Sequence, residues 1–180
     1  RERSNIESTD FSFTRFLAPY LCDYKGWAIF TDCDMLVTAD IAELWALRDD
    51  KYAVMCAKHD YQPVGDTKFL GQVQTKYEKK NWSSVMMFNN ARCTALTPEV
   101  VSTETGLFLH QFKWLGNDDL IGSLPLSWNY LVGEHQPTSS TPELIHYTLG
   151  GPYFEKYRDC EFADLWRAEL ARLNFATPDK

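Results

Sequence analysis

The chain lacks any run of apolar residues approaching the roughly 18 that a membrane-spanning helix needs. The basic residues at positions 1 and 3 are followed by no apolar stretch, so we find no signal peptide and expect a cytoplasmic location. The five cysteines are odd in number and scattered, without a Cys-x-x-Cys pair, which favours reduced thiols over a disulfide framework or a zinc site. Internal repeats, low-complexity tracts and linkers are also absent.

Basic residues are fewer than acidic ones. The chain has 18 Lys and Arg against 25 Asp and Glu, a formal net charge of −7 and a sequence pI near 5.1. A nucleic-acid-binding surface needs a basic face, and the small basic cluster at 76–80 is more typical of a solvated turn, so we expect no nucleic-acid partner. An acidic protein with an anionic ligand would need a cation to offset the repulsion between them.

Apolar residues are plentiful, at 44% hydrophobic and 14% aromatic over 180 residues, which is enough for one domain, 1–180, with a substantial core. A polar stretch at 58–81 predicts a loop that acts as a lid or a binding surface. The alternation of strand-like and helical patterns predicts an α/β fold, with a sheet covered by helices on both faces. We expect strands at 27–31, 51–57, 84–88 and 144–148, and helices at 13–21, 41–47, 98–103, 107–114 and 161–173, the last with its apolar residues buried on one side.

The most informative feature is an acidic pair, Asp32 and Asp34, which follows directly on the apolar run 27–31. Side chains two apart on extended backbone point to the same side, about 6–7 Å from each other along the strand. Two such carboxylates form a hard-oxygen site that suits Mg²⁺ or Mn²⁺ bound to a diphosphate. The alternative is a solvated strand-to-loop junction, where Asp is common. Cys33 is expected to point into the sheet as a small hydrophobic residue.

Several further segments occur in a characteristic order: 14–17, 29–34, 40–45, 83–89, 124–130 and 145–148. Together they resemble the nucleotide-sugar transferases of glycosyltransferase family 8. The resemblance covers most of the chain and implies a GT-A-like, Rossmann-related mixed sheet flanked by helices. The part of that family that holds the nucleotide base lies before the counterpart of residue 1, so we expect the chain to lack it.

The resemblance implies a metal-dependent glycosyltransferase that moves a sugar from a nucleotide-sugar donor to a glycan, protein or small-molecule acceptor, with retention of configuration. Asp32 and Asp34 match the metal-binding pair of the family, and His146 matches its third metal ligand. An imidazole beside two carboxylates favours Mn²⁺ over Mg²⁺ as the cofactor.

Three more residues match positions near the donor. Arg15 corresponds to a basic residue that lies near the donor in the family; its alternative is a surface ion pair with Asp10 or Asp23. Asp118 or Asp119 falls where relatives place polar residues around the donor sugar, as catalytic candidates, although either could simply cap a turn.

The other histidines and the large aromatic residues have weaker cases. His59 follows a predicted strand and is a candidate to line the site, whereas His110 and His135 are expected to be structural or surface residues. Trp82, Trp114 and Trp128 offer flat surfaces for a sugar ring but are more typical of a core.

Two departures from the family keep other functions open. Trp82 and Ser84 stand where relatives have Asn and Gly, and no lysine follows Gly150 and Gly151 in register to meet the pyrophosphate. These departures favour a non-catalytic binding or scaffold domain of the same fold. A nucleotidyltransferase, which also uses carboxylates at strand ends, is a third alternative.

Overall fold

The computed structural model describes residues 12–60 and 78–176. The predicted helix start at 8–10 and most of the predicted loop at 58–81 lie outside the described residues. Within those that are described, no helix is both long enough and apolar enough to cross a membrane.

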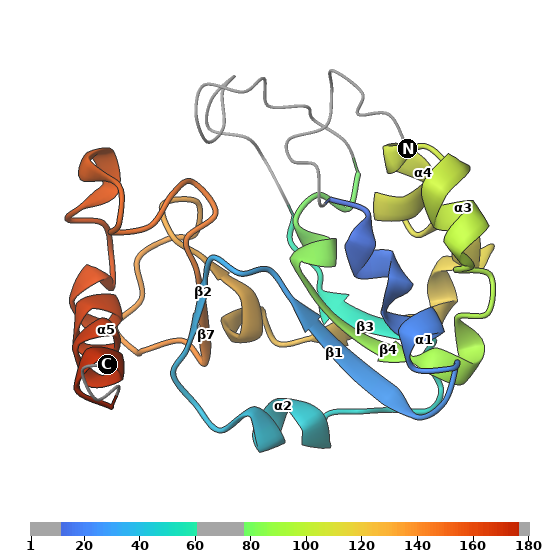
Figure 1. Ribbon diagram of the computed structural model, residues 1–180, viewed down its shortest axis with the longest axis horizontal. Helices are drawn as coiled ribbons and strands as arrows, with labels where there is room; N and C mark the ends of the chain where they lie inside the picture. The colour runs from blue at the N-terminus through green and yellow to red at the C-terminus, as the bar shows by residue number, and fades with distance from the viewer. Residues whose placement is uncertain (1–11, 61–77, 177–180) are drawn as a thin grey trace.

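The main sheet has four strands in the order β1-β4-β3-β5 (Figure 1). Its central strand β4 (Val85–Asn89) pairs antiparallel with β1 (Trp27–Thr31) and with β3 (Val54–Ala57), whereas β5 (Ile121–Leu124) runs parallel to β3. The sheet is therefore mixed, and the strands predicted at 27–31, 51–57 and 84–88 are confirmed. The sequence did not indicate β5, because Gly122 and Ser123 interrupt its apolar pattern. Gly122 is needed there, since a Cβ at this position would lie 2.6 Å from the Tyr52 ring.

A second, smaller sheet has the order β2-β7-β6. Strand β2 (Met35–Val37) pairs antiparallel with β7 (Leu144–His146), and β6 (Tyr130–Leu131) runs parallel to β7. The predicted strand at 144–148 is confirmed in shorter form, whereas β2 and β6 are too short to show a periodic pattern. The chain passes from the main sheet to the small sheet through residues 32–34.

Both faces of the main sheet are covered, as predicted. Along β4, Met86 and Phe88 belong to one core cluster and Val85 and Met87 to another, which is the alternation expected of a strand buried on both sides. The first cluster contains residues of α3 (Pro98–Thr103) and α4 (Gly106–His110), and the second contains Leu44 of α2 (Ile41–Ala46). The remaining helices are α1 (Ala18–Leu21), α5 (Ala163–Ala176) and the 3-10 turns η1 (Thr14–Leu17), η3 (Trp82–Ser84), η4 (Asn90–Arg92), η5 (Lys113–Leu115), η6 (Asp118–Leu120), η7 (Leu126–Asn129) and η8 (Glu155–Tyr157).

Helices α2 and α3 begin at residues whose side chains cap the helix. The side chain of Asp40 accepts a hydrogen bond from the Ala42 amide at the start of α2, and that of Thr97 accepts one from the Val100 amide at the start of α3. The helix predicted at 107–114 is instead divided, because Phe112 adopts a left-handed conformation (φ 58°) between α4 and η5.

The prediction for the last helix is wrong in one respect. Leu165, Leu170 and Leu173 are exposed to 39%, 41% and 61%, so the apolar residues of α5 do not form a buried side. Helix α5 lies at the end of the molecule beyond β7 (Figure 1), and Trp166, together with Phe162 just before the helix, packs against the small third core cluster. Because this core cluster is small, it covers only the residues of α5 that touch it, and the other apolar residues of the helix remain exposed.

Candidate metal centre

The site forms where the chain crosses from one sheet to the other. Asp32 and Asp34 follow β1, and His146 ends β7, opposite Met35 of β2. The Tyr147 amide donates a hydrogen bond to the Asp34 carbonyl at 3.0 Å, which extends this pairing by one step. The register of β2 with β7 therefore brings an imidazole beside a carboxylate that lies far away in the sequence.

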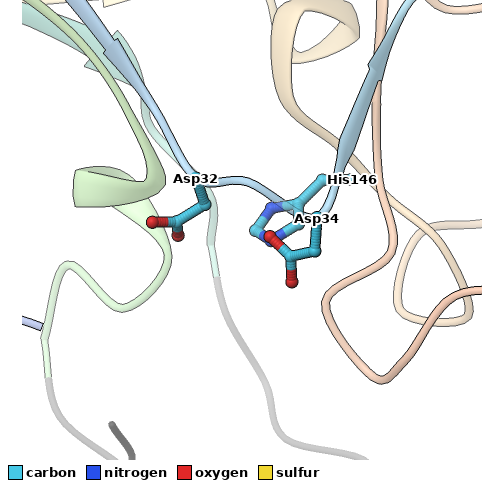
Figure 2. A group of neighbouring side chains, drawn as sticks. All are labelled: Asp32, Asp34 and His146. Carbon is cyan, nitrogen blue, oxygen red and sulfur yellow. The ribbon is translucent and has the colours of Figure 1, made fainter. Parts of the chain in front are cut away.

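The ligand atoms of Asp32, Asp34 and His146 all lie within 4.8 Å of one another. Figure 2 shows the two carboxylates on the same side of the connecting segment, with the imidazole beside Asp34. His146 Nε2 lies 3.4 Å from Asp34 Oδ1. The imidazole is almost fully buried, at 4% exposure, whereas the Asp32 and Asp34 side chains are 24% and 32% exposed. The group is thus open to solvent on the side of the carboxylates.

Arg15 of η1 holds Asp32 from the other side. Its guanidinium nitrogens lie 2.8 Å from Oδ1 and 3.2 Å from Oδ2 of Asp32, and it also donates to the Ser83 carbonyl at 2.8 Å. The guanidinium lies over the Phe30 ring, 5.1 Å from its centroid. The alternative that Arg15 pairs with Asp23 is wrong, and Asp10 lies outside the described residues.

The two carboxylates differ in their electrostatics. Burial raises the pKa of Asp32 above its usual value, although the positive charges of Arg15 and His146 offset part of that effect. Burial also raises the pKa of Asp34, but a protonated His146 outweighs it through its hydrogen bond and charge, so the net shift beside the protonated imidazole is downward. Asp34 is therefore the carboxylate more readily kept ionised.

The other histidines are engaged elsewhere. His59 Nδ1 lies 3.1 Å from His135 Nε2, and burial, with the charges of His135 and His146, lowers the pKa of His59 to about 3. His110 Nδ1 lies 2.7 Å from the hydroxyl of Ser83. His59 is thus paired with a second imidazole, and none of these three rings belongs to the cluster of Asp32, Asp34 and His146.

Asp118 and Asp119 are not brought into that cluster. Both are exposed residues of η6, and the Asp118 carboxylate lies 2.6 Å from Lys79 Nζ. They precede β5, which begins at the end of the main sheet opposite to the end where Asp32 follows β1.

The remaining expectations concern packing. Trp114 and Trp128 are core residues, as expected, and the Trp82 indole donates to the His59 carbonyl at 2.9 Å while packing against the first core cluster. Cys33 is exposed, so the prediction that it points into the sheet is wrong. The reason is that residues 32–34 form a bend between two strands, and the in-out alternation of a strand does not continue through them.

Solved structures that are similar to this chain in fold include glycosyltransferases. The chain is similar to GlyE of Streptococcus pneumoniae TIGR4, with a TM-score of 0.59 and 17% identity over 90% of this chain and 43% of that one. The apo form of GlyE has a TM-score of 0.57 and 18% identity over 91% of this chain and 43% of that one. The apo structure of the bifunctional glycosyltransferase WbbM has a TM-score of 0.50 and 16% identity over 88% of this chain and 35% of that one. The chain has the GT-A-like glycosyltransferase fold and spans less than half the length of these structures.

No family model matches the sequence. A relative, Protein CDI of Arabidopsis thaliana, is 54% identical over 181 residues, which cover 97% of this chain and 69% of the relative. The chain belongs to the same protein family as Protein CDI.

Proposed function

We propose that this chain is a single-domain, divalent-cation-dependent glycosyltransferase of the family 8 type. It transfers a sugar from a nucleotide-sugar donor to an acceptor, with retention of configuration. The observation that carries the proposal is the convergence of Asp32, Asp34 and His146 at the junction of the two sheets of a GT-A-like fold.

The residues present fit a divalent cation. Two carboxylates and an imidazole form a donor set that suits Mn²⁺ better than Mg²⁺, which prefers oxygen ligands throughout. The 3.4 Å between His146 Nε2 and Asp34 Oδ1 is close to the roughly 3 Å that separates adjacent ligands of one such ion. Because the carboxylates are partly exposed, coordination positions on the solvent side remain for phosphate oxygens.

The departing nucleoside diphosphate gathers negative charge as the glycosidic bond breaks, and a bound divalent cation supplies Lewis-acid stabilisation of that charge. Asp34 and His146 would hold the cation from the side of the small sheet, and Asp32 would hold it from the side of the main sheet. Arg15 orients Asp32 through both of its oxygens and adds a fixed positive charge to the site. We also propose that Asp118 or Asp119, which lie at the opposite end of the main sheet from the cluster, orients the acceptor.

A binding or scaffold domain without catalysis is the second candidate, and one observation favours it. Both oxygens of Asp32 are engaged by Arg15, which already neutralises a carboxylate that a cation would need. The indole of Trp82, at a position where relatives of the family 8 type have Asn, is also packed against the core.

The two candidates are separated by donor hydrolysis in the presence of Mn²⁺, measured over a panel of nucleotide sugars. Asp34→Asn keeps the size of the side chain and removes a charged ligand. Asp159→Asn makes the same change of charge at a position that is 89% exposed and outside the cluster. We expect hydrolysis with wild type and with D159N, and none with D34N. Calorimetric binding of a donor without any turnover would support the scaffold instead.

A further inference from the structure

The imidazole of His146 faces a hydrogen-bond acceptor on each side. Nδ1 lies 3.0 Å from Oδ1 of Asn129, and Nε2 lies 3.4 Å from Oδ1 of Asp34. A neutral imidazole carries one proton and can donate in only one of these directions. Its other nitrogen then presents a lone pair, and only a nitrogen with a free lone pair can bind a metal ion.

The orientation of the Asn129 amide follows from its other contacts. Its Nδ2 lies 3.2 Å from the Asn81 carbonyl oxygen and 2.8 Å from the Ser84 hydroxyl. A backbone carbonyl can only accept, so the NH₂ group of Asn129 must face it. The Ser84 hydroxyl donates to the same carbonyl at 2.6 Å, which leaves its oxygen free to accept from Asn129. With the NH₂ group so placed, the oxygen of the amide faces His146.

The surroundings hold this amide in place. Asn129 is fully buried at the end of η7, and Asn81 and Ser84, at 9% and 4% exposure, belong to the turn that leads into β4. Reversing the amide would bring two acceptors together at the Asn81 carbonyl and two donors together at a protonated Nδ1. Buried polar groups strongly disfavour such mismatches.

We propose that Asn129 is a positioning residue that selects the tautomer of His146 protonated on Nδ1, and thereby leaves the lone pair of Nε2 for a divalent cation. The proposal rests on the proposed function, since the cation is what Nε2 is held for. The shorter of the two contacts is satisfied by the proton, and the longer one leaves both Nε2 and the Asp34 carboxylate available to a cation. Such partners of ligating histidines orient the ring and set its tautomer.

The first test measures the tautomer in the metal-free wild-type protein. Long-range proton–nitrogen NMR correlations distinguish protonated from unprotonated ring nitrogens, and the spectrum of His146→Ala assigns the ring. At a pH where the spectrum shows a neutral imidazole, we expect Nδ1 protonated and Nε2 bare. A ring protonated on Nε2, or an even mixture of the two tautomers, overturns the proposal.

Asn129→Leu then tests the consequence, with Ser84→Ala as its matched control. Without an acceptor at Nδ1, the proton moves to Nε2, where Asp34 accepts it. The affinity for Mn²⁺ should fall roughly 10- to 100-fold in N129L, the range usual for loss of an outer partner of a metal ligand. In S84A the Asn81 carbonyl still orients the amide, so tautomer and affinity should remain as in wild type. If N129L folds and keeps the Nδ1–H tautomer, the proposal is wrong.

The outcomes separate this inference from the proposed function. A wild-type ring protonated on Nδ1 in a protein that binds no Mn²⁺ supports the role of Asn129 and contradicts the metal-dependent transferase. Binding of Mn²⁺ by a protein whose neutral His146 ring is protonated on Nε2 supports the metal-dependent transferase and contradicts the role of Asn129. If N129L does not fold, the wild-type tautomer and the S84A spectrum still decide the question.

Discussion

Met35 and His146 lie opposite each other in the antiparallel pair of β2 and β7, and this register sets the imidazole beside Asp34. The small sheet is thus part of the site and not an accessory to it. Its strand β7 contributes His146, a candidate ligand that lies more than a hundred residues from the acidic pair, while Asp32 directly follows β1 of the main sheet.

Replacement of Arg15 tests what holds Asp32. Arg15→Met keeps an unbranched apolar stem but leaves the carboxylate partly buried without its cationic partner, so the pKa of Asp32 should rise further. We expect a loss of about 1–3 kcal/mol in the free energy of unfolding, below the value for a fully buried pair because Asp32 is partly exposed. Urea denaturation measures the stability, and carboxyl carbon NMR follows the titration of Asp32. Arg15→Lys keeps the charge without the two-point contact, so its free energy of unfolding should lie between those of wild type and R15M. Equal stability of all three proteins would contradict a stabilising role for Arg15 beside Asp32.

The pair of His59 and His135 predicts a dependence of stability on pH. The pKa of His59 lies at about 3 in the fold, below its ordinary value of 6.5, so the unfolded chain binds a proton that the folded one excludes. Stability should therefore fall as the pH drops below 6.5, by up to about 1.4 kcal/mol per pH unit from this group. The buried Nε2 of His59, which has no hydrogen-bond partner, accounts for part of the cost of charging the ring.

His59→Gln removes that titration. The measurement is the free energy of unfolding by urea between about pH 7 and pH 5, a range above the ordinary titration of carboxylates. We expect a flatter profile for H59Q than for wild type. Parallel profiles for the two proteins would show that His59 is charged at little cost.

Asp118 and Asp119 provide a matched pair for the proposed contact with the acceptor. The side chain of Asp118 is 70% exposed and pairs with Lys79, so D118N should change stability by no more than about 0.5 kcal/mol. If one of the two carboxylates orients the acceptor, its change to Asn should lower kcat/KM for the acceptor roughly 10- to 100-fold, as misplacement of a substrate does. Binding of Mn²⁺ should be unaffected in both variants. Unchanged kcat/KM in D118N and in D119N would confine the site to the junction of the two sheets.

The elements that sequence analysis predicted well are those with a local cause. The apolar run of β1, the cap of α2 at Asp40 and the cap of α3 at Thr97 each depend on residues within a few positions of one another. The α/β class followed from the alternation of such elements, and the GT-A-like fold followed from the resemblance to a known family. Asp32 and Asp34 stood out because two acidic residues end an apolar strand.

The parts that were missed depend on tertiary packing. The exposed face of α5 could not be foreseen, because the small core cluster that it meets is assembled from β6, β7 and the segment around residue 162. Cys33 was misplaced because the strand was assumed to continue where the chain bends. Asn129 lies in segment 124–130 of the family resemblance but was not singled out: its role comes from three contacts, to His146, Asn81 and Ser84, and all three partners are distant from it in the sequence.

The most direct test of the account is the binding of Mn²⁺ itself, followed by the loss of the free-ion signal in electron paramagnetic resonance. We predict one site in wild type and in D159N, and an affinity lowered by roughly 100-fold or more in D34N and in His146→Ala, beyond the usual effect of losing an outer partner. Binding of Mn²⁺ that is equally tight in D34N, H146A and wild type, or the absence of binding to wild type, would contradict the claim that these side chains share one cation.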